Sequence, residues 1–137
     1  MPTSPTAPTT SISVVLVDDS EDLLFLVRGA LERGGQFRVV AEAGDGEQGV
    51  AAARAAQPDL VLLDIAMPVM DGMQALPLIR EVAPAATVVM LSGYPFSTAG
   101  QGALDAGAHG YLEKSDLVHG LIPRLERIIE GSSDGRV

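Results

Sequence analysis

Five polar side chains of this sequence each stand at or just beyond the end of a short apolar run, where a buried strand would reach the edge of a sheet. They are Asp18, Asp19, Asp64, Ser92 and Lys114. Three carboxylates that lie close together repel one another and therefore need a cation between them. Because no His or Cys stands beside them, the ligand atoms would all be oxygens, which favours Mg²⁺.

The same set contains the groups that phosphoryl transfer requires. A carboxylate can attack phosphorus and become an acyl phosphate. The metal ion and Lys114 would offset the negative charge of the phosphoryl group, and the Ser92 hydroxyl would donate to one of its oxygens. We therefore predict that Asp64 is a nucleophile that accepts a phosphoryl group, assisted by Ser92 and Lys114.

Alternating strands and helices are predicted to position these side chains. Apolar runs predict five strands, which are Ile12–Val17, Phe37–Ala43, Leu60–Leu63, Thr87–Leu91 and Ala108–Leu112. Helical spacing predicts helices at about 23–31, 46–56, 71–82, 97–106 and 117–129. This alternation indicates an α/β fold, a doubly wound five-stranded parallel sheet of flavodoxin-like order 2-1-3-4-5. Ligands of such sheets bind beyond the carboxyl ends of the strands, where the strand order reverses.

Composition limits the class of protein further. The 137 residues fit one domain, and a hydrophobic fraction of 47% is enough for an aliphatic core. The net charge of −9 argues against binding of nucleic acid, and the absence of Cys fits a cytoplasmic location. No apolar run is long enough for a membrane span. We expect residues 1–11 to form a disordered tail and residues 131–137 a polar tail or the start of a linker.

The motifs around these side chains resemble those of response-regulator receiver domains from two-component signalling. The resemblance covers Ile12–Glu130 and is greatest to receivers of LuxR-type regulators. It is carried by four segments, Val17-Asp18-Asp19-Ser20, Asp64-Ile65-Ala66-Met67-Pro68-Val69-Met70-Asp71-Gly72, Leu91-Ser92-Gly93 and Gly110-Tyr111-Leu112-Glu113-Lys114-Ser115. It implies a receiver domain at residues 12–130 that acts as a signalling domain and catalyses only its own phosphorylation and dephosphorylation.

The resemblance also implies roles for individual residues. Asp64 would take a phosphoryl group from a phosphohistidine on a histidine kinase or a histidine phosphotransfer protein. Asp19 would bind Mg²⁺ directly and Asp18 partly through water, with Asp64 and the backbone carbonyl of Ala66 as further ligands. The Ser92 hydroxyl and the Lys114 ammonium would contact phosphoryl oxygens.

A conformational switch is implied as well. On phosphorylation Ser92 would shift inward and Tyr111 would rotate from an exposed toward a buried position. The surface of the fourth helix, the fifth strand and the fifth helix would then change its partner, either a downstream protein or an output domain outside this chain. We expect a monomer or weak homodimer. The acidic net charge and the lack of a long apolar run predict no contact with nucleic acid or membrane.

Three positions differ from the usual receiver pattern. Ser115 follows Lys114, where many receivers have a proline, often with a cis bond. Val69 stands five residues after Asp64, where a glycine is usual and would leave the loop less restricted. Pro123 lies inside the fifth predicted helix, which we expect to bend or to start late. Apart from these three positions, Pro77 lies inside the third predicted helix and is expected to distort its first turns.

Three other functions compete with a phosphoacceptor. A flavin mononucleotide module of the same fold would need a phosphate-binding loop after the first strand, where this chain has acidic residues. A phosphate-ester hydrolase with an aspartate nucleophile would need a second acid two residues after Asp64, where this chain has Ala66. The third alternative is a receiver-like interaction or dimerisation module of a transcription regulator that is little phosphorylated.

Overall fold

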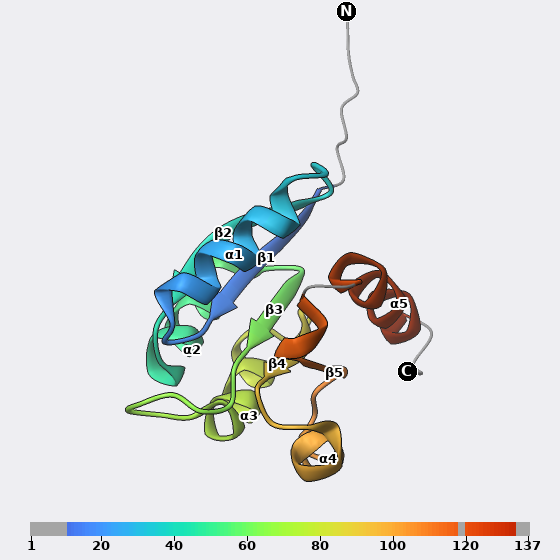
Figure 1. Ribbon diagram of the computed structural model, residues 1–137. Helices are drawn as coiled ribbons and strands as arrows, with labels where there is room; N and C mark the ends of the chain where they lie inside the picture. Colours follow the sequence, from blue (N-terminus) through green and yellow to red (C-terminus); the bar gives the residue numbers. More distant parts are fainter. Residues whose placement is uncertain (1–10, 118–119, 134–137) are drawn as a thin grey trace, which may run out of the picture.

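The computed structural model describes residues 11–117 and 120–133 and has five parallel strands in one sheet (Figure 1). The strands are β1 (Ile12–Val17), β2 (Phe37–Ala43), β3 (Leu60–Leu63), β4 (Thr87–Ser92) and β5 (Gly110–Glu113). Their order is β2-β1-β3-β4-β5, which confirms the predicted topology. All four strand pairs are parallel, so all five carboxyl ends lie at one edge of the sheet.

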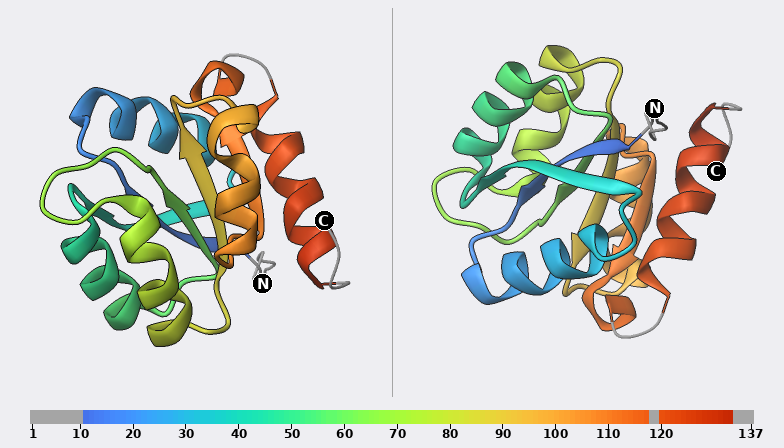
Figure 2. Two further views of the ribbon diagram at one scale, coloured as in Figure 1. Left: turned by 90° about the horizontal axis from the view of Figure 1, so that it is seen from below. Right: turned by 90° about the horizontal axis from the view of Figure 1, so that it is seen from above.

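Helices cover both faces of this sheet (Figure 2). They are α1 (Glu21–Glu32), α2 (Gly46–Ala56), α3 (Gly72–Val82), α4 (Gln101–Asp105) and α5 (Leu121–Ser133). Apolar residues of α1 and α5 pack on one face, and those of α2, α3 and α4 pack on the other. β3 is buried on both faces, as its uninterrupted apolar run predicts.

Three helices begin at the edge of the sheet that carries the carboxyl ends, and each has a side-chain cap. Ser20, Asp45 and Asp71 accept hydrogen bonds from the backbone N–H groups three residues later. Asp71 also forms a capping box with Gln74, whose side chain accepts from the Asp71 N–H. These caps fix the loops that follow β1, β2 and β3 against the helices.

The two helix prolines have different effects. Pro77 was expected to distort the third helix, but α3 runs through it without a break from Gly72 to Val82. The start of α5 at Leu121 puts Pro123 in the first turn, where a backbone N–H has no partner within the helix. The helix thus starts late, as expected, and Leu117 belongs to a separate 3-10 turn, Lys114–Leu117.

The region between β4 and β5 and the end of the last helix differ from expectation. The fourth helix, predicted at 97–106, is a π-helical turn, Phe96–Gly100, followed by only five α-helical residues. The Phe96 ring occupies the position that a side chain at Gly100 would take, because a Cβ there would lie 2.0 Å from the ring.

The final helix continues to Ser133, so it extends into the tail predicted at 131–137. Apart from Ser11 and this helix end, the tails predicted at 1–11 and 131–137 lie outside the described residues.

The edge strand β2 contains an irregularity. Val14 of β1 lies opposite Val39, but the next residue, Val15, lies opposite Ala41. Val40 is therefore an extra residue in β2, a β-bulge, and its side chain is exposed. Arg38 and Glu42 on either side of the bulge are exposed too, as expected for an edge strand.

Val69, in the loop between β3 and α3, has a backbone conformation that a β-branched residue rarely adopts. Its φ is 68° and its side chain is 75% exposed, so no burial compensates for the strain. We expect Val69→Gly to raise the free energy of unfolding by about 1 kcal/mol, because the relief of strain exceeds the entropy cost of glycine. Urea unfolding measures this change, and a loss of stability would contradict it.

Among the described residues, no helix is both long and apolar enough to cross a membrane.

Candidate functional site

The five polar side chains predicted to meet do so at the carboxyl edge of the sheet. Asp18 follows β1, Asp64 follows β3, Ser92 is the last residue of β4, and Lys114 follows β5. They line a cleft of about 240 Å³, whose walls consist of Asp18, Asp19, Ser20, Asp64, Ala66, Ser92, Gly93, Tyr94 and Lys114. Ala66, expected to offer its backbone carbonyl, is thus at the cleft as well.

Lys114 joins two of the carboxylates. Its Nζ lies 2.9 Å from Oδ2 of Asp18 and 3.3 Å from Oδ1 of Asp64. Although partial burial lowers the pKa of Lys114, the hydrogen bond to Asp18 and the charges of both carboxylates raise it above its ordinary value. The ammonium group is therefore charged at neutral pH and stands where it can contact a group bound to Asp64.

The Asp64 carboxylate is held by one of its oxygens. Oδ1 accepts a hydrogen bond from the Ile65 N–H at 2.8 Å and faces Lys114. Within the described residues, Oδ2 has no hydrogen bond, so it is available to a ligand. The side chain is 5% exposed, which makes it a buried carboxylate at the base of an open cleft.

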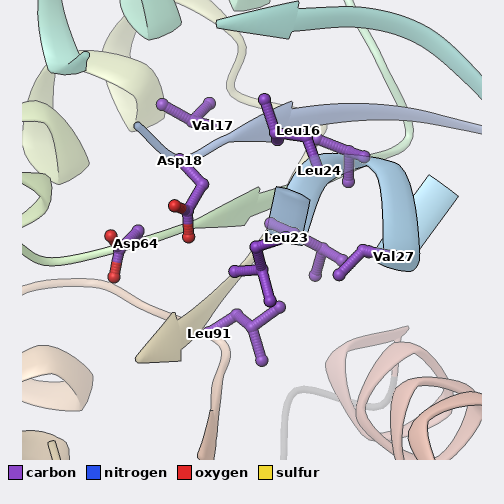
Figure 3. A pocket seen from close by; sticks show the side chains of 9 residues that line it. Leu16, Val17, Asp18, Leu23, Leu24, Val27, Asp64 and Leu91 are labelled. Carbon is purple, nitrogen blue, oxygen red and sulfur yellow. The ribbon is translucent and has the colours of Figure 1, made fainter. Parts of the chain in front are cut away.

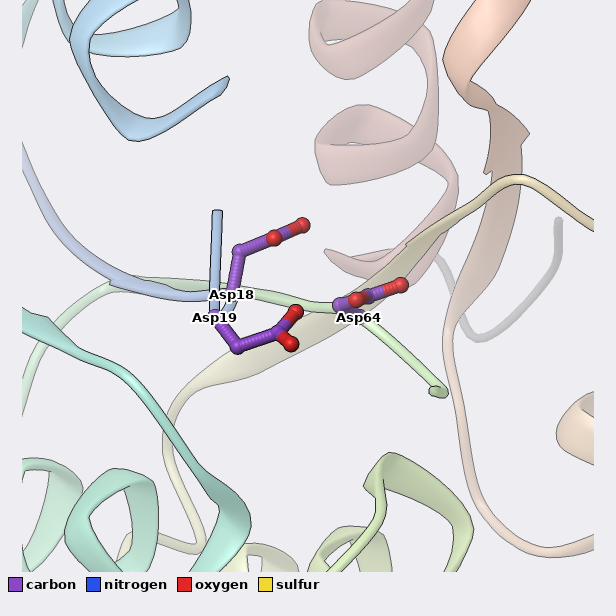
Figure 4. Close-up of side chains that lie close together, drawn as sticks. All are labelled: Asp18, Asp19 and Asp64. Atoms are coloured by element: carbon purple, nitrogen blue, oxygen red, sulfur yellow. The ribbon is translucent and has the colours of Figure 1, made fainter. Parts of the chain in front are cut away.

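The three acidic residues could together hold a metal ion (Figure 4). Asp18, Asp19 and Asp64 each offer one carboxylate oxygen, and these oxygens lie within 4.8 Å of one another. Asp18 and Asp64 are buried, whereas Asp19 is exposed and makes no hydrogen bond within the described residues. Oxygen donors of this kind fit a hard divalent cation such as Mg²⁺.

An apolar floor lies beneath Asp18 and Asp64 (Figure 3). A void of about 10 Å³ there is lined mainly by Leu and Val side chains of β1, β3, β4 and α1, and it has room for one water molecule at most. Burial against this floor, together with the charge of Asp18, raises the pKa of Asp64 to about 6 despite the opposing effect of Lys114.

This pKa makes Asp64 a source of instability above about pH 6. Its ordinary pKa is 3.8, so between 3.8 and about 6 the folded protein binds more protons than the unfolded chain. Stability therefore falls as pH rises through this window, by about 3 kcal/mol in total. Without metal, Asp64→Asn should raise the free energy of unfolding by about this amount at pH 8 and by little at pH 4. Urea unfolding over this pH range measures the difference, and a pH-independent difference would contradict it.

Ser92 is fully buried, and its hydroxyl has a defined partner. The Oγ accepts a hydrogen bond from the Tyr94 N–H at 3.0 Å, which leaves the hydroxyl hydrogen free to be donated. Tyr111, the residue expected to move, is half-buried, and its hydroxyl donates to the Tyr94 carbonyl at 2.7 Å. The backbone of Tyr94 thus links the two predicted switch residues.

The family of the chain follows from a comparison of its sequence. Residues 14–124 match the model of the response regulator receiver domain, and this match includes every side chain of the site. The chain belongs to the response regulator receiver domains.

Receiver domains of several larger proteins are similar to this one. It is 40% identical over 113 residues to a protein-glutamate methylesterase/protein-glutamine glutaminase of Paramagnetospirillum magneticum. That match covers 81% of this chain but only 30% of the methylesterase, so the chain spans less than a third of this relative. This receiver domain is a signalling domain.

Solved structures of receiver domains agree in fold. A two-component response regulator of the LuxR family from Aurantimonas sp. has a TM-score of 0.81 and 32% identity, over 88% of this chain and 86% of that one. A chain of the CheX-CheY-BeF3-Mg²⁺ complex from Borrelia burgdorferi has a TM-score of 0.70 and 31% identity, over 74% of this chain and 77% of that one. The resemblance to LuxR-type receivers predicted from sequence is thus confirmed.

Some contacts of this receiver domain were not predicted from its sequence. The backbone N–H groups of Ile65 and Tyr94 orient Asp64 and Ser92, and any residue type except proline could supply them. No sequence signal could have found these contacts. The peptide bond between Lys114 and Ser115 is trans, so the receiver domain positions Lys114 without the cis proline that many receivers have.

Proposed function

We propose that this receiver domain is a phosphoacceptor, in which Asp64 takes a phosphoryl group from a phosphohistidine of a histidine kinase or phosphotransfer protein. One observation carries the proposal, namely the buried Asp64 carboxylate in contact with Lys114 beside two further carboxylates. A lone buried aspartate would suit many roles, but this combination of charges suits a ligand that brings its own negative charge.

The transfer step requires little from the protein beyond position and charge. Oδ2 of Asp64 forms a bond to phosphorus while the bond from phosphorus to the imidazole nitrogen of the donor breaks. The imidazole keeps the electron pair of that bond and takes a proton from solvent. Lys114 then turns from Asp18 toward a phosphoryl oxygen, and the Ser92 hydroxyl donates to another.

Asp18, Asp19, Asp64 and the Ala66 carbonyl would hold Mg²⁺ in this site. When bound, the ion supplies positive charge opposite the phosphoryl oxygens and between the carboxylates. The acidic donor set supports this assignment, as does the similarity to a chain of the CheX-CheY complex from Borrelia burgdorferi, which contains BeF3 and Mg²⁺. The Asp18 carboxylate is already oriented by the Ser20 N–H and by Lys114.

The output of the phosphorylated state is proposed to be a change in the surface of α4, β5 and α5. Ser92 and Tyr111 both contact the backbone of Tyr94, so a movement of Ser92 toward the phosphoryl group would be transmitted to Tyr111. The partner of this surface is a downstream protein or an output domain, and we place the exchange in the cytoplasm.

Binding of Mg²⁺ and labelling by a small phosphodonor test the proposal together. Excess Mg²⁺ should raise the melting temperature of the wild type by several degrees but not that of Asp19→Asn, which loses a ligand without losing a hydrogen bond. Acetyl phosphate should then add one phosphoryl group per chain, seen by intact mass, only when Mg²⁺ is present. Sustained turnover of phosphate esters would instead favour a hydrolase, and equal labelling in a chelator would contradict the metal site.

A further inference from the structure

The loop that follows Ser92 is attached to β5 by side chains that point to one side of that strand. The Tyr111 hydroxyl donates to the Tyr94 carbonyl, and its ring meets the Phe96 ring edge-on at a centroid distance of 5.6 Å. Two residues further along β5, the Glu113 carboxylate accepts a hydrogen bond from the Phe96 N–H at 2.9 Å. Glu113 thus fixes the point where the loop enters its π-helical turn.

Glu113 also has a defined place relative to the phosphoacceptor site. In the register of the sheet it lies opposite Ser92, and it directly precedes Lys114. The carboxylate at the end of β5, directly before Lys114, therefore contacts the loop that directly follows Ser92. It does not line the cleft and is not among the acidic residues that could hold a metal ion.

The loop has few other attachments that could replace this contact. Gly93 has open space around its Cα, and the Tyr94 and Phe96 side chains are both substantially exposed. Among the described residues, the backbone of segment 93–96 makes three hydrogen bonds to side chains, which are those of Ser92, Tyr111 and Glu113. Its other backbone hydrogen bonds lie at the start of the π-helical turn.

We propose that Glu113 is a positioning residue for phosphorylation, which holds the loop so that the Ser92 hydroxyl faces the phosphoryl group on Asp64. This inference rests on the proposed phosphoacceptor function. The positioning role requires a hydrogen-bond acceptor at position 113, because its partner is the backbone N–H of Phe96. Loss of this acceptor frees the Phe96 N–H and lets the loop sample positions in which Ser92 is turned away.

Substitutions of Glu113 separate the hydrogen bond from the charge. Glu113→Ala should slow labelling by acetyl phosphate about ten-fold, the change expected for loss of one charge-assisted hydrogen bond. Glu113→Gln, whose amide oxygen can still accept from Phe96, should stay within about three-fold of the wild type. Glu113→Asp keeps the charge but is one methylene shorter, so it should resemble Glu113→Ala. Mg²⁺ binding should be unchanged in all three.

A double-mutant cycle with Ser92→Ala shows whether Glu113 acts through Ser92. In the Ser92→Ala background, Glu113→Ala should change the labelling rate by less than two-fold. Tyrosine emission gives an independent signal, because the only two tyrosines, Tyr94 and Tyr111, both lie at this loop and the chain has no Trp. It should change in Glu113→Ala and return to the wild-type value in Glu113→Gln.

The outcomes distinguish a failure of the Glu113 positioning role from a failure of the phosphoacceptor function. Equal effects of Glu113→Ala with and without Ser92, or a Glu113→Gln protein as slow as Glu113→Ala, would overturn the positioning role. If Glu113→Ala does not fold, the comparison of Glu113→Asp with Glu113→Gln decides the same point. A wild type that is not labelled at all would contradict the phosphoacceptor function itself.

Discussion

Asp64→Asn is expected to abolish phosphorylation by acetyl phosphate in the presence of Mg²⁺, below the detection limit of intact-mass measurement. The amide is nearly isosteric with the carboxylate and can still accept from the Ile65 N–H, so the fold is retained. It lacks the negative oxygen that attacks phosphorus, and no other carboxylate of the cleft occupies its position at the end of β3. The loss should therefore be complete rather than partial.

Asp71→Asn is a matched control for this substitution. It makes the same chemical change in the loop that follows β3, but at the N-cap of α3, where Asn caps about as well as Asp. Labelling of Asp71→Asn should remain close to that of the wild type. Undiminished labelling of Asp64→Asn, or equal losses in both proteins, would show that the phosphoryl group is carried elsewhere or that the loop as a whole was disturbed.

Gly72→Ala should be the most damaging single-methyl change near the site. A Cβ at this position would lie 1.9 Å from the Asp64 carbonyl oxygen and 2.9 Å from the Ile65 Cα, so the backbone that carries Asp64 must move. We expect a loss of about 3 kcal/mol in the free energy of unfolding from this overpacking. The phosphorylation rate should fall about 100-fold, because a displacement of about 1 Å is enough to misplace the nucleophile.

Gly102→Ala provides the comparison. Gly102 lies in α4 with open space around its Cα, so an added methyl group meets no other atom and favours the helix by about 1 kcal/mol. Thermal unfolding should therefore place Gly72→Ala well below the wild type and Gly102→Ala at or above it. A Gly72→Ala protein with wild-type stability and phosphorylation would mean that the loop after β3 adapts freely.

Most of the fold and the main site residues could be predicted because the sequence encodes them in independent ways. The β3 run Leu60–Leu63 is too short for a helix, and the polar residues stand directly at the strand ends, so topology alone brings Asp18 and Asp64 together. Helix boundaries with side-chain caps, such as Asp45 and Asp71, were correct within a residue.

Predictions were weaker where backbone conformation depends on tertiary contacts. The π-helical turn at Phe96–Gly100 requires the Phe96 ring to lie over Gly100, and periodicity does not encode that contact. The distortion predicted from Pro77 is absent, because the capping box and the buried face of α3 stabilise the helix. Contacts to backbone groups, such as that between Glu113 and Phe96, become visible only when the register of β4 and β5 is known.

The bulge at Val40 has a consequence for self-association. An exposed parallel edge strand offers unpaired N–H and C=O groups on which a strand from another molecule can assemble. The extra residue breaks the regular spacing of these groups in the middle of β2, and the exposed Arg38 and Glu42 would come close to an incoming strand. Sheet extension across the β2 edge is therefore disfavoured, and this edge is an unfavourable place for two copies of the chain to pair.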